Sequence, residues 1–159
     1  MQTRNRATSG FTLVELMIVI AILGLLAAVA IPQFTSSKEE GKTAAMVSSL
    51  SILRTAIDSY WSQHDGFPGT TAKLFGNQLL KKTNKAGKVG ASAAFGYGPY
   101  LRNGKLPTNP LTNTNTVKPV AVMPKAPSGT QAWIYNYVTG EIRSNSPGKD
   151  LNGVPYFSL

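Results

Sequence analysis

The chain has 159 residues, of which 42% are hydrophobic, and its 16 Lys and Arg against seven Asp and Glu give a net charge of +9. This length fits a single domain, and the composition is that of a folded rather than a disordered protein. There is no cysteine, which excludes disulfides, thiolate metal sites, cysteine nucleophiles and a lipid anchor on cysteine.

The first element is a long apolar segment, Phe11–Phe34, which follows a short start containing Arg4 and Arg6. Its 24 residues are enough to cross a bilayer as a helix, which takes about 20 apolar residues. Glu15 is its only charged residue. The segment is therefore a secretory signal peptide, a plain membrane anchor, or a segment that is cut before it acts.

Glu15 distinguishes these three interpretations. A signal peptide usually has a shorter apolar run of about 7–15 residues, and Glu15 would interrupt it. A plain anchor leaves Glu15 unexplained, because a carboxylate inside a bilayer is costly. A cut between Gly10 and Phe11 would create an ammonium group four residues before Glu15. Because positions i and i+4 share a helix face, the acid would then lie beside a positive charge of its own chain or of a neighbour.

Residues 4–34 closely resemble the class III signal of type IV pilins and type II secretion pseudopilins. Their sequence is RNRATSGFTLVELMIVIAILGLLAAVAIPQF. The resemblance implies that a membrane prepilin peptidase removes a leader peptide, residues 1–10, by cutting between Gly10 and Phe11. It also implies N-methylation of Phe11 and a role for Glu15 in subunit assembly. Residues 11–34 would then form the transmembrane segment of the monomer and the core of a filament.

The helical pattern continues beyond this segment. Pro32 removes one backbone hydrogen bond and is predicted to kink the helix. Gly66 and Pro68 stop the helix, so the sequence predicts one helix from about Phe11 to His64. Its second half is predicted to be amphipathic, because apolar residues recur there at intervals of three or four: Met46, Leu50, Leu53 and Ile57.

Residues 35–159 are predicted to hold the amphipathic half of the helix and a globular head. The head is expected to begin with a short helix at Thr71–Leu80, followed by a Gly-rich loop. Val117–Met123 is typical of an edge strand or a connector, because it contains Pro119.

The end of the chain carries the clearest strand signals. Gln131–Asn145 is predicted to form a hairpin with Thr139 and Gly140 at its turn, and residues 152–159 suggest a turn and a short closing strand. The expected fold is α+β and pilin-like: a long N-terminal α-helix packed against a small C-terminal antiparallel β-sheet.

No catalytic residue is predicted, and the protein is not expected to be an enzyme. The single histidine, His64, precedes Asp65, but neighbours on a helix point in different directions, so a polar helix end is favoured over an acid–base pair. Many major pseudopilins hold calcium in their C-terminal loop. Here only Glu141 and Asp150 offer carboxylates, too few for a site of about 6–8 oxygen ligands. We therefore expect no metal and no cofactor.

Basic residues dominate the range from Gly66 to Gly140, which holds nine Lys or Arg and no acidic residue. Such a surface can attract nucleic acid or another polyanion. A solvated surface without a dedicated ligand is the favoured interpretation. The candidate anion or DNA contacts are Lys81, Lys82, Lys85 and Lys88.

The resemblance implies a structural subunit of a type IV pilus-like filament. The precursor would sit in the cytoplasmic membrane, be processed by the peptidase, and polymerise with its own copies through the N-terminal helices on an assembly platform. The filament would be an extracellular pilus or a periplasmic pseudopilus. Three alternatives stay open: the major pseudopilin of a type II secretion system, a DNA-binding competence pilin, and a plain anchored periplasmic domain.

Overall fold

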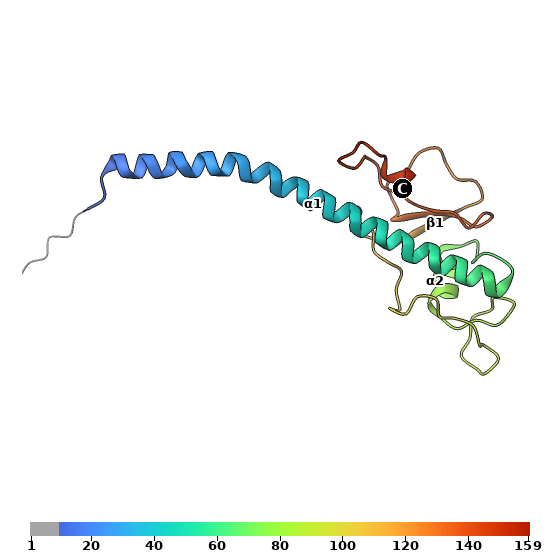
Figure 1. The fold of residues 1–159 in the computed structure, drawn as a ribbon. Coiled ribbons are helices and arrows are strands. Elements are labelled where there is room, and N and C mark those ends of the chain that lie inside the picture. Colours follow the sequence, from blue (N-terminus) through green and yellow to red (C-terminus); the bar gives the residue numbers. More distant parts are fainter. Residues whose placement is uncertain (1–9) are drawn as a thin grey trace, which may run out of the picture. The chain divides into compact units, whose positions relative to one another are not determined.

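A computed structural model describes residues 10–159 of the protein, including only the backbone of Pro32. Within these residues it shows a long helix, α1 (Leu13–His64), a short helix, α2 (Ala72–Leu80), and three strands (Figure 1). The chain divides into two compact units, Met1–Lys38 and Glu39–Leu159, and α1 contributes residues to both.

The described part of the first unit is the apolar beginning of α1. All its large apolar side chains from Phe11 to Phe34 whose placement is described are exposed, from 47% for Val19 to 87% for Phe11. A helix that is apolar on every side is stable in lipid or against other helices rather than in water. The stretch is long and apolar enough to cross a membrane.

The second unit is built around the amphipathic part of α1. Met46, Leu50 and Leu53 are fully buried and Ile57 is nearly so. They belong to one core cluster with residues of the sheet, including Trp133. Figure 1 shows this green part of α1 running alongside the strands. The predicted apolar seam of the helix is therefore confirmed, and α1 ends at His64 as predicted.

The sheet contains β1 (Val117–Val120), β2 (Trp133–Asn136) and β3 (Ile142–Ser144) in the order β1-β2-β3. All four residues of β2, the central strand, are buried. The α+β, pilin-like fold is thus confirmed. β2 and β3 form the predicted antiparallel hairpin, and Pro119 lies in an edge strand as expected.

The expectation of a wholly antiparallel sheet is wrong for one pair. β1 runs parallel to β2, with Val117 opposite Trp133. The reason lies in the connection between them, which has 12 residues (121–132). A parallel pair needs a crossover of about a dozen residues or more, whereas a tight turn joins antiparallel strands.

The predicted closing strand at the C-terminus is also wrong. Tyr156–Ser158 form a 3-10 helix, whose Phe157 is buried at 7% exposure. Only an isolated bridge between Lys149 and Pro155 resembles sheet pairing there. Pro155 has no N–H to donate to a ladder, so the pairing does not extend.

The short helix α2 confirms the prediction for Thr71–Leu80. Thr71 is its N-cap, because the Oγ1 of Thr71 accepts the backbone N–H of Leu74 at 3.2 Å. Such a cap satisfies one of the free N–H groups at the start of a helix. Phe75 and Leu79 then bury its apolar side in the core.

Candidate functional site

The first turn of α1 is held together by Thr12 and Glu15. The backbone N–H of Thr12 donates to Oε2 of Glu15 at 2.9 Å, and the Thr12 hydroxyl donates to the same oxygen at 2.8 Å. In return, the Glu15 N–H donates to Oγ1 of Thr12 at 3.2 Å. This reciprocal pair is a capping box, which satisfies two backbone donors that have no partner within the helix.

The capping role of Glu15 was not part of the sequence interpretation, although its signal was present. TLVE, residues 12–15, has the spacing of Ser or Thr followed three residues later by Glu at the start of a helix. Glu15 therefore has a local structural role in the uncut chain. Among the described residues, the hydrogen bonds that the Glu15 carboxylate accepts all go to Oε2, which leaves Oε1 open to solvent.

The predicted processing site lies directly before this cap. Gly10 and Phe11 precede the helix, and both are exposed. The remaining leader residues, 1–9, lie outside the described residues. Pro32 lies inside α1, whose helical backbone continues through it. The predicted kink at Pro32 and the predicted cut between Gly10 and Phe11 stay predictions.

The head has its own polar cluster at the end of α1, centred on His64. Its Nδ1 lies 3.0 Å from the carbonyl oxygen of Lys85, so Nδ1 is the donor. Its Nε2 lies 2.9 Å from the Tyr100 hydroxyl and 3.0 Å from Oγ1 of Thr83. The ring stacks on Tyr60 at 4.1 Å between centroids. His64 thus connects the Gly-rich loop to the end of α1, which is a structural role.

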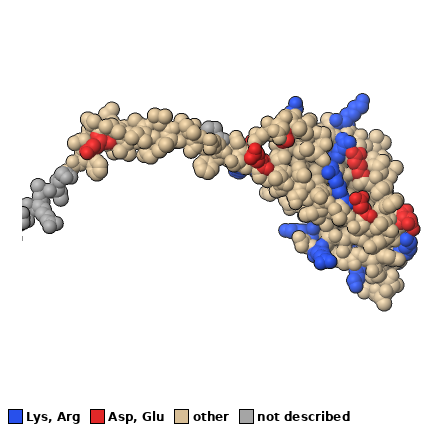
Figure 2. All heavy atoms as spheres, viewed as in Figure 1, with Lys and Arg blue, Asp and Glu red and all other residues tan. Residues whose placement is uncertain are grey.

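The four candidate anion contacts are all exposed, but they are not equivalent. Lys85 forms an ion pair with Asp65 at 2.9 Å and donates to the carbonyl of Gln63 at 2.8 Å. Lys81, Lys82 and Lys88 have no side-chain partner among residues 10–159. Figure 2 shows the basic side chains of the head spread over the face in view, with acidic ones between them. They do not form one continuous patch on that face.

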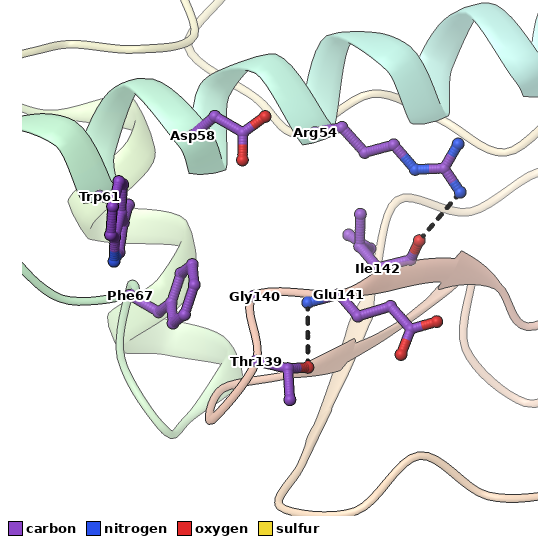
Figure 3. Close-up of a pocket in the computed structure, with 8 residues that line it drawn as sticks. All are labelled: Arg54, Asp58, Trp61, Phe67, Thr139, Gly140, Glu141 and Ile142. Carbon is purple, nitrogen blue, oxygen red and sulfur yellow. Dashed lines mark hydrogen bonds between the residues drawn. The ribbon is translucent and has the colours of Figure 1, made fainter.

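A groove of about 450 Å³ lies between α1 and the turn that joins β2 and β3 (Figure 3). Trp61 and Phe67 stack beside it at 6.2 Å between centroids, and Arg54 donates to the carbonyl of Ile142 at 3.3 Å. None of the residues predicted to act in processing, assembly or DNA binding lines it. The lining is Arg54, Asp58, Trp61, Phe67, Thr139, Gly140, Glu141 and Ile142.

Gly140 is required at this turn for two reasons. Its φ is 76°, a backbone conformation that residues other than glycine rarely adopt. A β-carbon there would also collide with the ring of Phe67. This explains why the Thr139-Gly140 signal located the hairpin correctly.

Both carboxylates considered for calcium are engaged by the protein itself. Glu141 accepts from Nε of Arg143, and Oδ1 of Asp150 accepts the N–H groups of Asn152 and Val154 at 2.9 and 2.7 Å. Within residues 10–159 no three His, Asp or Glu side chains gather as metal ligands. The expectation of no metal and no cofactor stays a prediction.

Three tyrosines in the head are perturbed by burial. Burial raises the pKa of Tyr60, Tyr100 and Tyr135 above the ordinary value for a phenol. Tyr135 is fully buried and its hydroxyl donates to the carbonyl of Pro68 at 3.1 Å. The effect is structural, because no nucleophile or base adjoins this hydroxyl in the contacts described for it.

The sequence is similar to that of known proteins, first of all in its N-terminal segment. The family described as the prokaryotic N-terminal methylation motif matches residues 5–31. The type II secretion system core protein G of Pseudomonas aeruginosa is 32% identical over 117 residues, covering 69% of this chain and 72% of that protein. Core protein G of Aeromonas hydrophila is 33% identical over 110 residues, with the same coverage.

Pilins are similar over shorter stretches. The type IV major pilin protein PilA of Myxococcus xanthus is 39% identical over 95 residues, which is 58% of this chain and 40% of that protein. No solved structure matched the chain. Together, the N-terminal methylation motif, the pilin-like fold and the extended similarity show that the chain belongs to the family of type IV pilins and type II secretion pseudopilins.

Proposed function

We propose that this chain is the repeating subunit of a pilus-like filament. The precursor is held in the cytoplasmic membrane by residues 11–34, is cut between Gly10 and Phe11, and is methylated at the nitrogen of Phe11. The subunits then polymerise through their N-terminal helices. The observation that carries this proposal is the exposed apolar surface of α1, together with membership of the pilin family.

Assembly has to keep that apolar surface covered at every stage. Fifteen large apolar side chains between Phe11 and Phe34 are exposed by 47% or more in the single chain. In the membrane they are covered by lipid, and a helix leaves lipid favourably only if other apolar helices cover the same surface. Identical subunits provide such helices, so the segment that anchors the precursor also forms the filament core.

Glu15 serves this assembly through its second oxygen. Its Oε2 is occupied by the cap of its own helix, whereas Oε1 is open. Cleavage after Gly10 turns the nitrogen of Phe11 into an ammonium group. The carboxylate can then accept that group from a neighbouring subunit through Oε1 while Oε2 keeps the first turn formed. A buried carboxylate is tolerated in an apolar bundle when it is paired in this way.

A pseudopilus is the second candidate for the kind of filament. The similarity to the core proteins G covers 69% of this chain, whereas that to a fimbrial protein of Pseudomonas aeruginosa covers 34%. A stretch of 54 residues is about the length of the N-terminal helix, which pilins and pseudopilins share. Similarity to the pilin PilA also extends beyond the helix, over 58% of this chain, so the support for a pseudopilus is the greater coverage by the secretion proteins.

A DNA-binding competence pilin is less well supported. One of the four candidate lysines, Lys85, is already paired, and on the face shown in Figure 2 acidic side chains lie between the basic ones. Retention of the chain on DNA should show a steep salt dependence if this function exists. The variant K81A/K82A should weaken it while K73A, on α2, should not. Equal retention of all three proteins, or equal retention on a neutral matrix, would remove this candidate.

Processing and assembly are tested together with leader variants. Gly10→Val should block the cut, so the subunit keeps residues 1–10 and is absent from filaments sheared from the cell surface or collected from the periplasm. Ser9→Val, one residue earlier in the leader, is the matched control and should be cut and assembled normally. Filaments of Gly10→Val at the wild-type amount would contradict the proposal.

A further inference from the structure

The chain contains two Asn-Gly pairs, Asn103-Gly104 and Asn152-Gly153, and all four residues are exposed. An asparagine before glycine is prone to deamidation, because no side chain on the glycine hinders attack of its backbone nitrogen on the asparagine side chain. That attack requires a backbone N–H that is free to lose its proton. Because both pairs are exposed, exposure predicts no difference in their rates of deamidation. Their hydrogen bonds do predict a difference.

The pair at Asn152-Gly153 is held by Asp150. The N–H of Gly153 donates to the carbonyl of Asp150 at 3.0 Å, and the N–H of Asn152 donates to Oδ1 of Asp150 at 2.9 Å. The attacking nitrogen is therefore occupied. The nearby carboxylate of Asp150 also opposes the negative charge that develops on that nitrogen.

The pair at Asn103-Gly104 is held less firmly. Arg102 and Asn103 also form a turn, but within residues 10–159 neither the N–H of Gly104 nor the side chain of Asn103 makes a hydrogen bond of ordinary length and angle. The flanking charges are positive rather than negative, since Arg102 and Lys105 lie on either side and are exposed. Positive charges favour loss of a proton from the Gly104 nitrogen.

We infer that Asn103 is a site of spontaneous deamidation in the folded protein and that Asn152 is protected. The Gly104 nitrogen loses its proton to solvent base and bonds to Cγ of Asn103. The Cγ–Nδ2 bond then breaks as Nδ2 takes a proton from water and leaves as ammonia, which gives a cyclic imide. Water opens the ring at either carbonyl to give aspartate or isoaspartate.

The product adds a negative charge to a basic groove. Asn103, Arg102 and Lys105 line a groove of about 430 Å³ together with Ile52 and Tyr100. Each conversion lowers the formal net charge of +9 by one. The change takes place in the head and does not depend on the state of the N-terminal helix.

The test is ageing of the purified full chain in mild detergent at slightly alkaline pH, followed by mass analysis of chymotryptic peptides for conversion of asparagine to aspartate. Asn103 should react about tenfold faster than Asn152, since one protecting backbone hydrogen bond must break at the latter. In the chain denatured with urea, the two rates should converge. Conversion of Asn152 as fast as Asn103 in the folded chain would overturn the inference, as would a rate ratio that denaturation leaves unchanged.

Charge variants test the electrostatic part. R102Q/K105Q should slow conversion of Asn103 about two- to threefold, the effect expected of exposed charges, and should leave Asn152 unchanged. Asn103→Gln should abolish the aspartate and isoaspartate products at this position and is the control for peptide assignment. An unchanged rate at Asn103 in R102Q/K105Q would contradict the role given to the two cations.

Discussion

Replacing Tyr135 with Phe should change the stability of the head in opposite directions at neutral and alkaline pH. The Tyr135 hydroxyl is fully buried and donates to the carbonyl of Pro68 at 3.1 Å. Near neutral pH, Tyr135→Phe should therefore lower the free energy of unfolding by about 1 kcal/mol, the net value of one hydrogen bond.

The alkaline effect follows from the raised pKa of Tyr135, which is caused mainly by burial. Below about pH 10, tyrosine is protonated in both the folded and the unfolded chain, so its contribution is fully present. As the pH rises above this value, only the unfolded chain loses the proton, and the folded state of the wild type becomes less stable. At about pH 11 this loss is about 1.4 kcal/mol.

Tyr135→Phe has no proton to lose and escapes this penalty. The wild type should therefore be more stable by about 1 kcal/mol at about pH 8, the two proteins should change order between about pH 10 and about pH 11, and Tyr135→Phe should be more stable by about 0.4 kcal/mol at about pH 11. Tyr60 and Tyr100 also have a raised pKa, but both proteins contain them, so their contributions cancel in the difference.

The assay is urea unfolding of both full-length proteins in the same mild detergent, followed by near-ultraviolet circular dichroism. This signal reports the packing of aromatic side chains and therefore follows the head. A gap between the two proteins that stays constant or widens from neutral to alkaline pH would refute the reasoning, because it would mean that Tyr135 does not stay protonated in the folded state.

Three further predictions concern the cap, the core and metal binding. Glu15→Gln keeps an acceptor for the capping box but removes the charge, so the subunit should be cut normally and yield far fewer filaments. Asn109→Ala should lower the free energy of unfolding by about 3 kcal/mol. The buried amide of Asn109 donates to the Ala132 carbonyl and to the Ser146 hydroxyl, and it accepts the N–H of Leu111. Removing calcium with a chelator should leave the melting temperature of the wild type unchanged.

Each of these outcomes has a clear opposite. Wild-type filament yield from Glu15→Gln would show that the cap, not the charge, is what assembly requires, and Glu15→Val would then be the informative variant. Asn103→Ala is the exposed control for Asn109→Ala and should change stability by no more than about 0.5 kcal/mol; an equal effect of both would contradict the buried network. A fall in melting temperature on chelation would show a metal site that the carboxylates of the described residues do not indicate.

The helix and the hairpin could be predicted because their signals are local. The apolar seam from Met46 to Ile57 repeats every three or four residues, and Gly66 and Pro68 come soon after His64, the last residue of the helix. Thr139-Gly140 supplies a turn whose second residue needs a positive φ. In each case neighbouring residues determine the conformation, so a single sequence is sufficient.

The direction of β1 and the end of the chain could not be predicted in the same way. Whether Val117–Val120 pairs parallel or antiparallel with β2 depends on the path of residues 121–132, which have no periodic pattern. The buried position of Phe157 likewise depends on the core that it meets. Such choices are made by tertiary packing rather than by local preference.

The contacts of His64 could not be predicted from local sequence either. Sequence proximity suggested Asp65, but the ring contacts Thr83, Lys85 and Tyr100, which are 19, 21 and 36 residues away. Asp65 instead has a φ of 54° and pairs with Lys85. Only the fold of the Gly-rich loop brings these groups together.

The capping box is the opposite case, because its signal was local and was overlooked. The lone charge of Glu15 in an apolar run favours charge pairing as its interpretation, whereas Thr12, three residues before it, gives the signal of a capping box. The structure gives the carboxylate a role within its own helix. Pairing with the Phe11 nitrogen of a neighbour then becomes a second role, available once the leader is removed.

The intact mass of the subunit recovered from sheared or periplasmic filaments tests the central claim most directly. The account predicts a mass equal to residues 11–159 plus one methyl group, with the methyl located on the nitrogen of Phe11 by fragmentation. A subunit that retains residues 1–10, or filaments that lack this chain, would contradict it.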